Sequence, residues 1–223
     1  MAEYHAPEFH PAFEEYCEAI FELQEDDVNV IQARIAERLN VSRPAVSEMI
    51  RRMESEGFVD IDGAIVLTGA GRKLAESVVR RHRLAERLLV DVLGLSWADA
   101  HKEAGKWEHI ISEPVEAAMV RVLDDPTTCP HGNPIPGSHY EDTGAIPLTD
   151  LGVGDEFTVI RIPEELEFEP GMLDFLEQSS ILPGRHGTIT ASSPDGTTTV
   201  EIEGTHIGVG AFPSQRILVS PAA

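Results

Sequence analysis

The chain has 223 residues, 42% of them hydrophobic, and a formal net charge of −22. This length allows one to three small domains with real cores. No apolar run reaches membrane-spanning length and no secretory N-terminal pattern is present, so we expect a cytoplasmic protein without a membrane partner. Cys17 and Cys129 stand far apart without C-x-x-C spacing, which argues against a disulfide framework and against a thiolate zinc site.

The positive charge is concentrated in one window of the chain. Residues 34–87 hold 11 basic and 8 acidic residues, a net charge of +3, whereas the rest of the chain holds 6 basic and 31 acidic residues. A local phosphate-binding surface needs such a window, although the whole chain is strongly acidic.

The basic residues are 14 Arg and only 3 Lys. Many carboxylates with scarce lysine suggest a halophile, a cell with molar internal salt, and the alternative is an ordinarily acidic bacterial protein. At molar salt the attraction between arginine and phosphate is largely screened, so DNA reading would rest on groove shape and apolar base contacts.

The N-terminal third is typical of a winged helix-turn-helix. Apolar spacing predicts helices over residues 11–25 and 30–39, and a third over 42–57 with Ser42 as its N-cap. Two short β-type runs then flank an Asp-Gly pair at 62–63, which is a strong hairpin signal.

The rest of the chain changes from helical to β-type patterning. We expect a long helix over 69–92, one from Ser96 to about residue 111, and one from Ser112 to about residue 123. Residues 124–148 have no period and are predicted to be a linker. A small SH3-like β-barrel is expected after it, with one helix at 172–178 and strands at 156–162, 188–191, 198–202 and 216–219.

Two groups of imidazoles and carboxylates follow the winged unit. His82 and Glu86 are four residues apart, and so share one face of a helix. His101, Glu108 and His109 lie on one stripe of the next predicted helix. Such side chains on facing helices can bind a divalent transition metal, and a metal site beside a DNA reader suggests a sensor.

Several spaced motifs resemble the diphtheria-toxin-repressor family of metal-dependent transcriptional regulators. They are I-Q-A-R-I-A-E-R-L-N-V-S-R-P-A-V-S-E-M-I-R-R-M-E-S-E-G, R-R-H-R-L-A-E-R-L-L, H-K-E-A-G-K-W-E-H and H-G-N-P-I-P-G. The resemblance implies a multidomain, mainly α protein with β structure. Its parts would be a winged helix-turn-helix over 1–70, a helical dimerisation and metal-binding domain over 71–140, and an SH3-like domain over 148–223.

The resemblance also implies two metal sites per subunit for Mn(II) or Fe(II) as co-repressor. An ancillary site would use His82, Glu86, His101, Glu164 and Glu167. The last two have the alternative of a solvated acidic turn.

A primary site would use Glu108 and His109 with Glu15 and Glu18 of the first helix, and the alternative for these two acids is again a solvated surface. The family usually has Cys or Glu where this chain has Gly105, so one side-chain ligand is missing. The remaining all-oxygen and nitrogen donors suit Mn(II) or Fe(II), with a slight lean towards Mn(II).

The expected partner is double-stranded operator DNA bound by a homodimer. Candidate DNA contacts are Arg34, Ser42, Arg43, Pro44, Ala45, Ser47, Glu48, Arg51 and Arg52. The small residues and Glu48 can approach base edges, and the arginines can hold phosphates.

Two other functions are compatible with the same residues. One is a di-metal hydrolase with Glu103 or Glu108 as base, although no H-E-x-x-H motif or evident nucleophile is present. The other is a winged-helix dimer that works without metal, which the gap at Gly105 favours. The motifs favour the interpretation that the protein is a repressor and not an enzyme.

Overall fold

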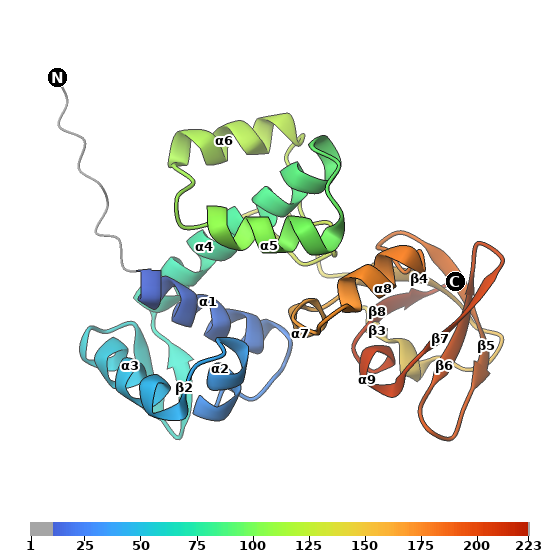
Figure 1. The fold of residues 1–223 in the computed structure, drawn as a ribbon, viewed down its shortest axis with the longest axis horizontal. Coiled ribbons are helices and arrows are strands. Elements are labelled where there is room, and N and C mark those ends of the chain that lie inside the picture. The colour runs from blue at the N-terminus through green and yellow to red at the C-terminus, as the bar shows by residue number, and fades with distance from the viewer. Residues whose placement is uncertain (1–10, 223) are drawn as a thin grey trace. The chain divides into compact units, whose positions relative to one another are not determined.

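The computed structural model describes residues 11–222. The chain divides into two compact units, one up to Val79 and one from Arg80 (Figure 1). Within the described residues, no helix combines the length and the apolar character that crossing a membrane requires.

The first unit is a winged helix-turn-helix, as predicted. Its elements are α1 (Pro11–Glu25), α2 (Gln32–Arg38), α3 (Arg43–Ser55), β1 (Val59–Asp62), β2 (Ala64–Leu67) and the start of α4 (Gly69–Arg87). The strands form an antiparallel hairpin with Val59 opposite Leu67, and Gly63 at its tip has a φ of 76°. A core that includes Phe13, Ile20 and Ile50 holds the helices together.

Local signals explain where α3 begins. Asn40 has a left-handed backbone, with a φ of 50°, and ends the preceding helix. Ser42 then caps α3, because its Oγ accepts a hydrogen bond from the backbone N–H of Ala45 at 3.3 Å. Pro44 occupies the first turn, where the missing N–H costs nothing.

The second unit begins with helices. It contains the end of α4, the π-helical turn η1 (Leu88–Val92), α5 (Trp97–Trp107) and α6 (Glu113–Val122). The predicted helix over 69–92 is confirmed in extent, but its last five residues form a wider, π-helical turn. Gly94, with a φ of 73°, follows its end. Helix α5 ends earlier than predicted, because the N–H groups of Ile110 and Ile111 both return to the carbonyl of Trp107.

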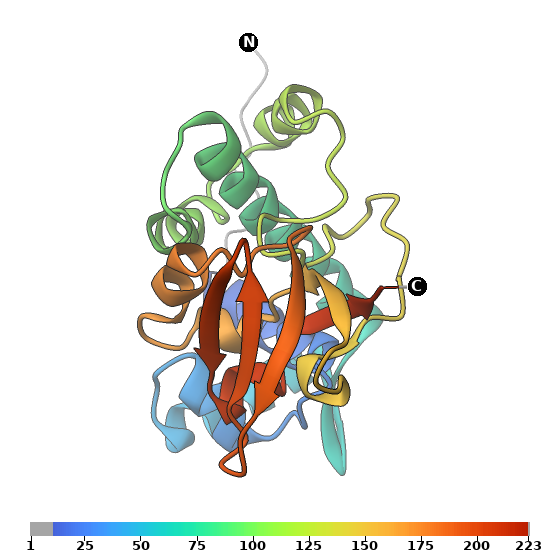
Figure 2. The same ribbon diagram turned by 90° about the vertical axis from the view of Figure 1, so that its right-hand side faces the viewer.

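An antiparallel six-stranded sheet forms the rest of this unit, in the order β3-β8-β4-β5-β6-β7 (Figure 2). The elements are β3 (Ile146–Pro147), η2 (Leu148–Asp150), β4 (Glu156–Arg161), α7 (Glu164–Glu167), α8 (Met172–Gln178), β5 (His186–Ser192), β6 (Thr198–Ile202), β7 (Thr205–Val209), α9 (Ala211–Ser214) and β8 (Leu218–Pro221). The predicted helix at 172–178 is confirmed. The expected barrel is not closed. Among the described strands, β3 and β7 lie at opposite edges of the sheet and do not pair with each other. Strand β7 was missed, because T-H-I-G-V has only two apolar residues that point inward.

The linker after α6 is fixed against the end of β4. The N–H of Ile162 donates to the carbonyl of His131 at 2.8 Å, and the Asn133 side chain donates to the carbonyl of Ile162 at 2.9 Å. A Cβ on Gly132 would lie 2.2 Å from the carbonyl oxygen of Ile160, so only glycine permits this approach. These contacts fix His131 beside α7.

Candidate metal centre

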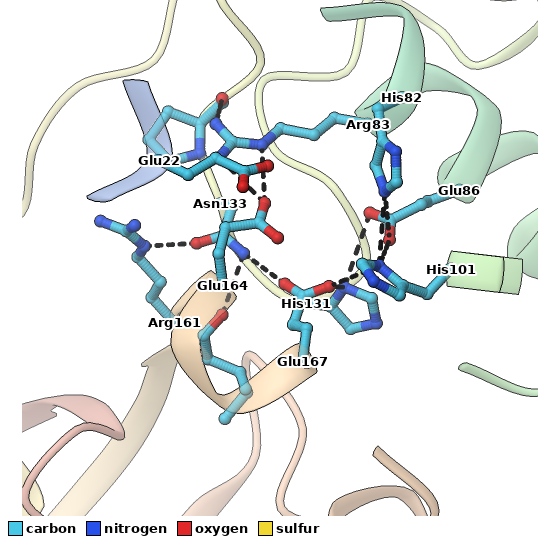
Figure 3. Close-up of polar contacts among 12 residues, drawn as sticks. Glu22, His82, Arg83, Glu86, His101, His131, Asn133, Arg161, Glu164 and Glu167 are labelled. Carbon is cyan, nitrogen blue, oxygen red and sulfur yellow. Dashed lines mark hydrogen bonds and ion pairs between the residues drawn. The ribbon is translucent and has the colours of Figure 1, made fainter. Parts of the chain in front are cut away.

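Four separate elements of the second unit bring ionisable side chains to one point. His82 and Glu86 come from α4, His101 from α5, His131 from the linker and Glu167 from α7. Figure 3 shows these five side chains pointing toward one another. The centre therefore joins the helical part of the unit to the part that contains the sheet.

The carboxylates of Glu86 and Glu167 link the three imidazoles. Glu86 Oε1 lies 3.2 Å from His82 Nε2 and 3.0 Å from His101 Nδ1. Glu167 Oε2 lies 3.2 Å from His101 Nδ1 and 2.7 Å from His131 Nδ1. The side chains of Glu86, Glu167 and His131 have no exposed area, so the centre is shielded from water except at His101 and His82, which are 16% and 9% exposed.

Several of these buried atoms lack a hydrogen-bond partner within the described part of the chain. They are Oε2 of Glu86, Oε2 of Glu164, Oε2 of Glu167 and both ring nitrogens of His131. The short approach of His131 Nδ1 to Glu167 lacks hydrogen-bond geometry. A buried polar atom without a partner costs about 1–3 kcal/mol, so such a group of them requires a further ligand. Lone pairs of imidazole and carboxylate directed at one point fit a divalent transition metal.

Cys129 extends this donor set. A ligand atom of Cys129 lies within 4.8 Å of ligand atoms of Glu86 and His131, and the same holds for His82, Glu86 and His101. Burial and the neighbouring carboxylate of Glu86 together raise the pKa of the Cys129 thiol to about 11. The thiol is therefore protonated at neutral pH unless a cation binds it.

Protons balance the buried charge in the metal-free centre. Burial alone would lower the pKa of His101, but the adjacent carboxylates of Glu167 and Glu86 raise it to about 9. Burial opposes the charged form of Glu86 as well, yet the imidazoles of His131 and His82 hold its pKa well below the usual range. The carboxylates are thus ionised and ready to bind a cation.

Glu164 and Glu167, both expected as ligands, occupy different environments. Glu167 faces His101 and His131, whereas Oε1 of Glu164 accepts from Arg83 Nη2 at 3.0 Å, in a pair that is 0% and 1% exposed. Burial and the neighbouring charge of Glu167 raise the pKa of Glu164. One oxygen of Glu164 is therefore engaged by an arginine, and only the other is available to an ion.

Sequence reasoning missed His131 and misjudged Cys129. His131 lies in the H-G-N-P-I-P-G segment, which contributed only to the resemblance, and the absence of C-x-x-C spacing removed Cys129 from consideration. The signal was present as C-P-H, a thiol and an imidazole two residues apart. Cys129 and His131 lie more than 40 residues after Glu86 in the sequence, so no local pattern predicts that they contact it.

His82 connects the centre to the second predicted ligand pair. Its Nδ1 lies 2.5 Å from Glu108 Oε2, while Glu108 Oε1 lies 3.1 Å from His109 Nε2. Burial alone would lower the pKa of His82, but Glu86 and Glu108 raise it well above the ordinary value. One imidazole therefore touches both groups.

The two acids predicted from the first helix lie on α1 of the first unit. Glu15 is exposed and Glu18 is half-buried, one turn further along the helix. A Cβ added to Gly105 would meet no atom within 4 Å, so its place in α5 is open. The association of Glu15 and Glu18 with Glu108 and His109 stays a prediction.

The predicted DNA contacts lie mostly on the exposed side of α3. Ser42, Arg43, Pro44, Ala45, Glu48, Arg51 and Arg52 are exposed, as is Arg34 on α2, and Ser47 is half-buried. Arg51 donates to Ser47 Oγ at 3.0 Å, Arg52 pairs with Glu56 and Arg34 pairs with Glu37. These are exposed ion pairs and hydrogen bonds of small energy, which a phosphate can replace.

Comparisons with known proteins cover nearly the whole chain. Models of three domain families match: the iron dependent repressor N-terminal DNA binding domain over residues 8–64, the iron dependent repressor metal binding and dimerisation domain over 68–137, and the FeoA domain over 146–221. The iron-dependent repressor IdeR of Mycobacterium tuberculosis is 40% identical in an alignment of 204 positions that covers 86% of this chain and 88% of that protein. The diphtheria toxin repressor of Corynebacterium diphtheriae is 46% identical over 144 residues, 64% of this chain and 59% of that protein.

Solved structures show the same architecture. A manganese-dependent transcriptional repressor in complex with manganese superposes with a TM-score of 0.85 and 34% identity, over 94% of this chain and all of the other. The IdeR of T. acidophilum superposes with a TM-score of 0.76 and 26% identity, over 98% of this chain and 100% of the other. The winged helix-turn-helix, the buried cluster of imidazoles and carboxylates and these matches together show that the chain belongs to the diphtheria-toxin-repressor family of metal-dependent regulators.

Proposed function

We propose that the protein is a homodimeric transcriptional repressor that binds operator DNA when Mn(II) or Fe(II) occupies two sites in each subunit. The observation that carries this proposal is the buried convergence of His82, Glu86, His101, His131 and Glu167. The matches to a DNA binding domain and to a metal binding and dimerisation domain in the same chain support a link between metal binding and DNA binding. The domains are proposed to span residues 1–70, 71–140 and 148–223, and the protein to act in the cytoplasm.

The ancillary site is proposed to be the centre around Glu86. Its main ligands are His82, Glu86, His101 and Glu167. Glu164 can add its second oxygen, Oε2, which does not contact Arg83. His131 and Cys129 enlarge the set proposed from the sequence. A bound metal supplies positive charge that replaces the protons on the imidazoles, and so holds α4, α5, the linker and α7 together.

The primary site is proposed to use Glu108 and His109 with Glu15 and Glu18 of α1. His82 supports this site, because its Nδ1 contacts Glu108 at 2.5 Å and thereby orients the carboxylate. A metal held from both units would fix the DNA-reading unit relative to the dimerisation helices. The two reading heads of a dimer then match half-sites about one helical turn apart.

The mixed set of imidazoles and carboxylates suits divalent first-row transition metals. Oxygen and nitrogen ligands accept Mn(II) and Fe(II), and a thiolate from Cys129 would add affinity for softer ions such as Zn(II). The geometry gives no preference between Mn(II) and Fe(II), and homologues are named for both metals.

DNA reading is proposed for α3. Its exposed small residues Ser42, Pro44 and Ala45, with Ser47 and Glu48, would approach base edges, and Arg34, Arg43, Arg51 and Arg52 would hold phosphates.

The two alternatives lack this support. A di-metal hydrolase is not favoured, because the matched families are repressors rather than enzymes. A metal-independent regulator leaves the unpartnered atoms of Glu86, His131 and Glu167 unexplained.

A duplex selection followed by gel shift tests the proposal. A pool of random duplexes is enriched by binding in the presence of Mn(II), and the enriched duplex is then titrated with protein, with and without Mn(II), Fe(II) or Zn(II). We expect binding that requires metal and that Glu108→Gln abolishes, while the dimer persists in sedimentation.

Glu103→Gln is the matched control. Glu103 lies on α5, five residues before Glu108, but pairs with Lys106 on the surface, so this variant should retain metal-dependent binding. Equal DNA binding with and without metal would refute the sensor, and metal-dependent turnover lost in Glu103→Gln would favour the hydrolase.

A further inference from the structure

A cavity of about 140 Å³ adjoins the buried centre on the side of α7 and α8. It reaches His101 and Glu167, and its outer wall includes Phe168, Glu169 and Asp174. His101 is also the most exposed of the centre's imidazoles, at 16% against 9% for His82 and 0% for His131. The cavity is therefore where the buried centre comes closest to water.

The end of the cavity presents unused ligand capacity. Glu167 has no exposed side-chain area, and its Oε2 lacks a hydrogen-bond partner within the described part of the chain. His101 Nδ1 lies 3.2 Å from the same oxygen. An ion that arrived through the cavity would meet these two groups first.

The exposed mouth of the cavity carries only negative charge, and the imidazole of His101 lies at its inner end. Glu167, Glu169 and Asp174 are acidic, and no Lys or Arg lines the cavity. Glu169 and Asp174 are exposed at its mouth. A concave surface lined by one sign of charge raises the local concentration of counter-ions and speeds their arrival.

Phe168 restricts the same opening. Its ring meets the ring of His101 edge to face, with centroids 5.3 Å apart, and the side chain is 48% exposed. Gly171, with a φ of 75°, turns the chain between α7 and α8 and leaves this ring at the rim. The aromatic ring is thus placed to limit the width of the path to His101.

We infer that this cavity is the access port through which a divalent cation reaches the ancillary site, with Glu169 and Asp174 as an electrostatic funnel and Phe168 as its constriction. The inference rests on the proposed function, because it assumes that the centre holds metal. It assigns the two acids to the rate of ion arrival and not to coordination.

Stopped-flow mixing with Mn(II) tests the port. Trp97 is a built-in reporter, because its ring lies 4.5 Å from that of His131, and Trp107→Phe removes the other of the two tryptophans. In this background Glu169→Gln/Asp174→Asn should slow association about threefold or more in 50 mM KCl and leave dissociation unchanged. In 1 M KCl, where the screening length is about 3 Å, the difference should vanish.

Two further variants make the test specific. Glu141→Gln/Asp150→Asn removes the same charge from exposed positions outside the cavity and should leave both rates unchanged. Phe168→Ala should speed association and dissociation equally, so that their ratio, the equilibrium constant, stays the same.

The outcomes separate the inference from the proposed function. No Mn(II) response in the parent protein at equilibrium would refute metal binding itself. Normal equilibrium binding with unchanged association in the Glu169/Asp174 variant would overturn the port alone. Faster dissociation in that variant would also overturn it, because the acids would then stabilise the bound ion.

Discussion

Glu86 is the residue on which the centre is built. Its side chain is fully buried and lies within 3.5 Å of three imidazoles, those of His82, His101 and His131. An ionised carboxylate in such a place needs positive charge, which protonated imidazoles provide when metal is absent. Metal and protons therefore compete for the same ligands.

This competition predicts that rising pH lowers the stability of the metal-free protein and increases the stabilisation that metal provides. The pKa of His101 is raised from 6.5 to about 9 in the metal-free fold. Its stabilisation is fully present below pH 6.5 and is lost as the pH rises through 9, because the unfolded state binds fewer protons. We expect the melting temperature of metal-free protein to fall between pH 6.5 and 9, and the increase caused by Mn(II) to grow.

Scanning calorimetry with and without Mn(II) measures both trends. His101→Gln, which cannot titrate in this range, should flatten the metal-free profile. A metal-free melting temperature that rises between pH 6.5 and 9 would contradict the assignment of the proton to the centre.

The buried ion pair of Arg83 and Glu164 should contribute to the stability of the fold. Both side chains are buried, at 0% and 1% exposure. Arg83→Met would leave the Glu164 carboxylate without its cation, so we expect a loss of about 3–5 kcal/mol in the free energy of unfolding. Adding Glu164→Gln should recover part of this loss in urea denaturation, and equal stability of the single and double variants would argue against the charge as its cause.

Among the elements, α5 and α4 each contain a glycine in a different setting. Gly105 lies within α5, where an added Cβ meets nothing within 4 Å, whereas a Cβ on Gly71 in α4 would lie 2.0 Å from the carbonyl oxygen of Phe58. The same substitution should therefore have opposite effects at the two positions.

Gly105→Ala should stabilise the protein by about 1 kcal/mol, because alanine loses less backbone entropy in a helix. In a chain of this size that raises the melting temperature by about 2–4 °C. Gly71→Ala, the matched control, should lower it. A destabilised Gly105→Ala would mean that a partner surface lies against α5 at this place.

At the scale of the whole molecule, the charge of −22 governs the response to salt. Only 17 basic residues oppose 39 acidic ones, so folding brings like charges together. Screening relieves this repulsion, and the screening length falls from about 10 Å at 0.1 M to 3 Å at 1 M salt.

We expect the melting temperature to rise with KCl up to about 1 M, where screening is nearly complete. A further rise between 1 and 3 M, absent with betaine at equal osmolality, would support adaptation to molar salt. A plateau above 1 M would identify an ordinarily acidic protein. At such salt the charge of the access port is screened as well, and its shape would control ion arrival.

The sequence by itself determined the domain architecture and two of the helices that contribute ligands, α4 and α5. Periodicity, the cap at Ser42 and the Asp-Gly turn predict the winged unit, because these signals act within a few residues. The spacing of His82 and Glu86 is likewise a local property of one helix.

Only the tertiary structure decided how these side chains meet. It brought His131 and Cys129 to Glu86, engaged one oxygen of Glu164 with Arg83, and placed His82 against both Glu86 and Glu108. It also left the sheet open. These features depend on residues far apart along the chain whose contacts are fixed by packing against β4 and α7, and no local pattern records such contacts.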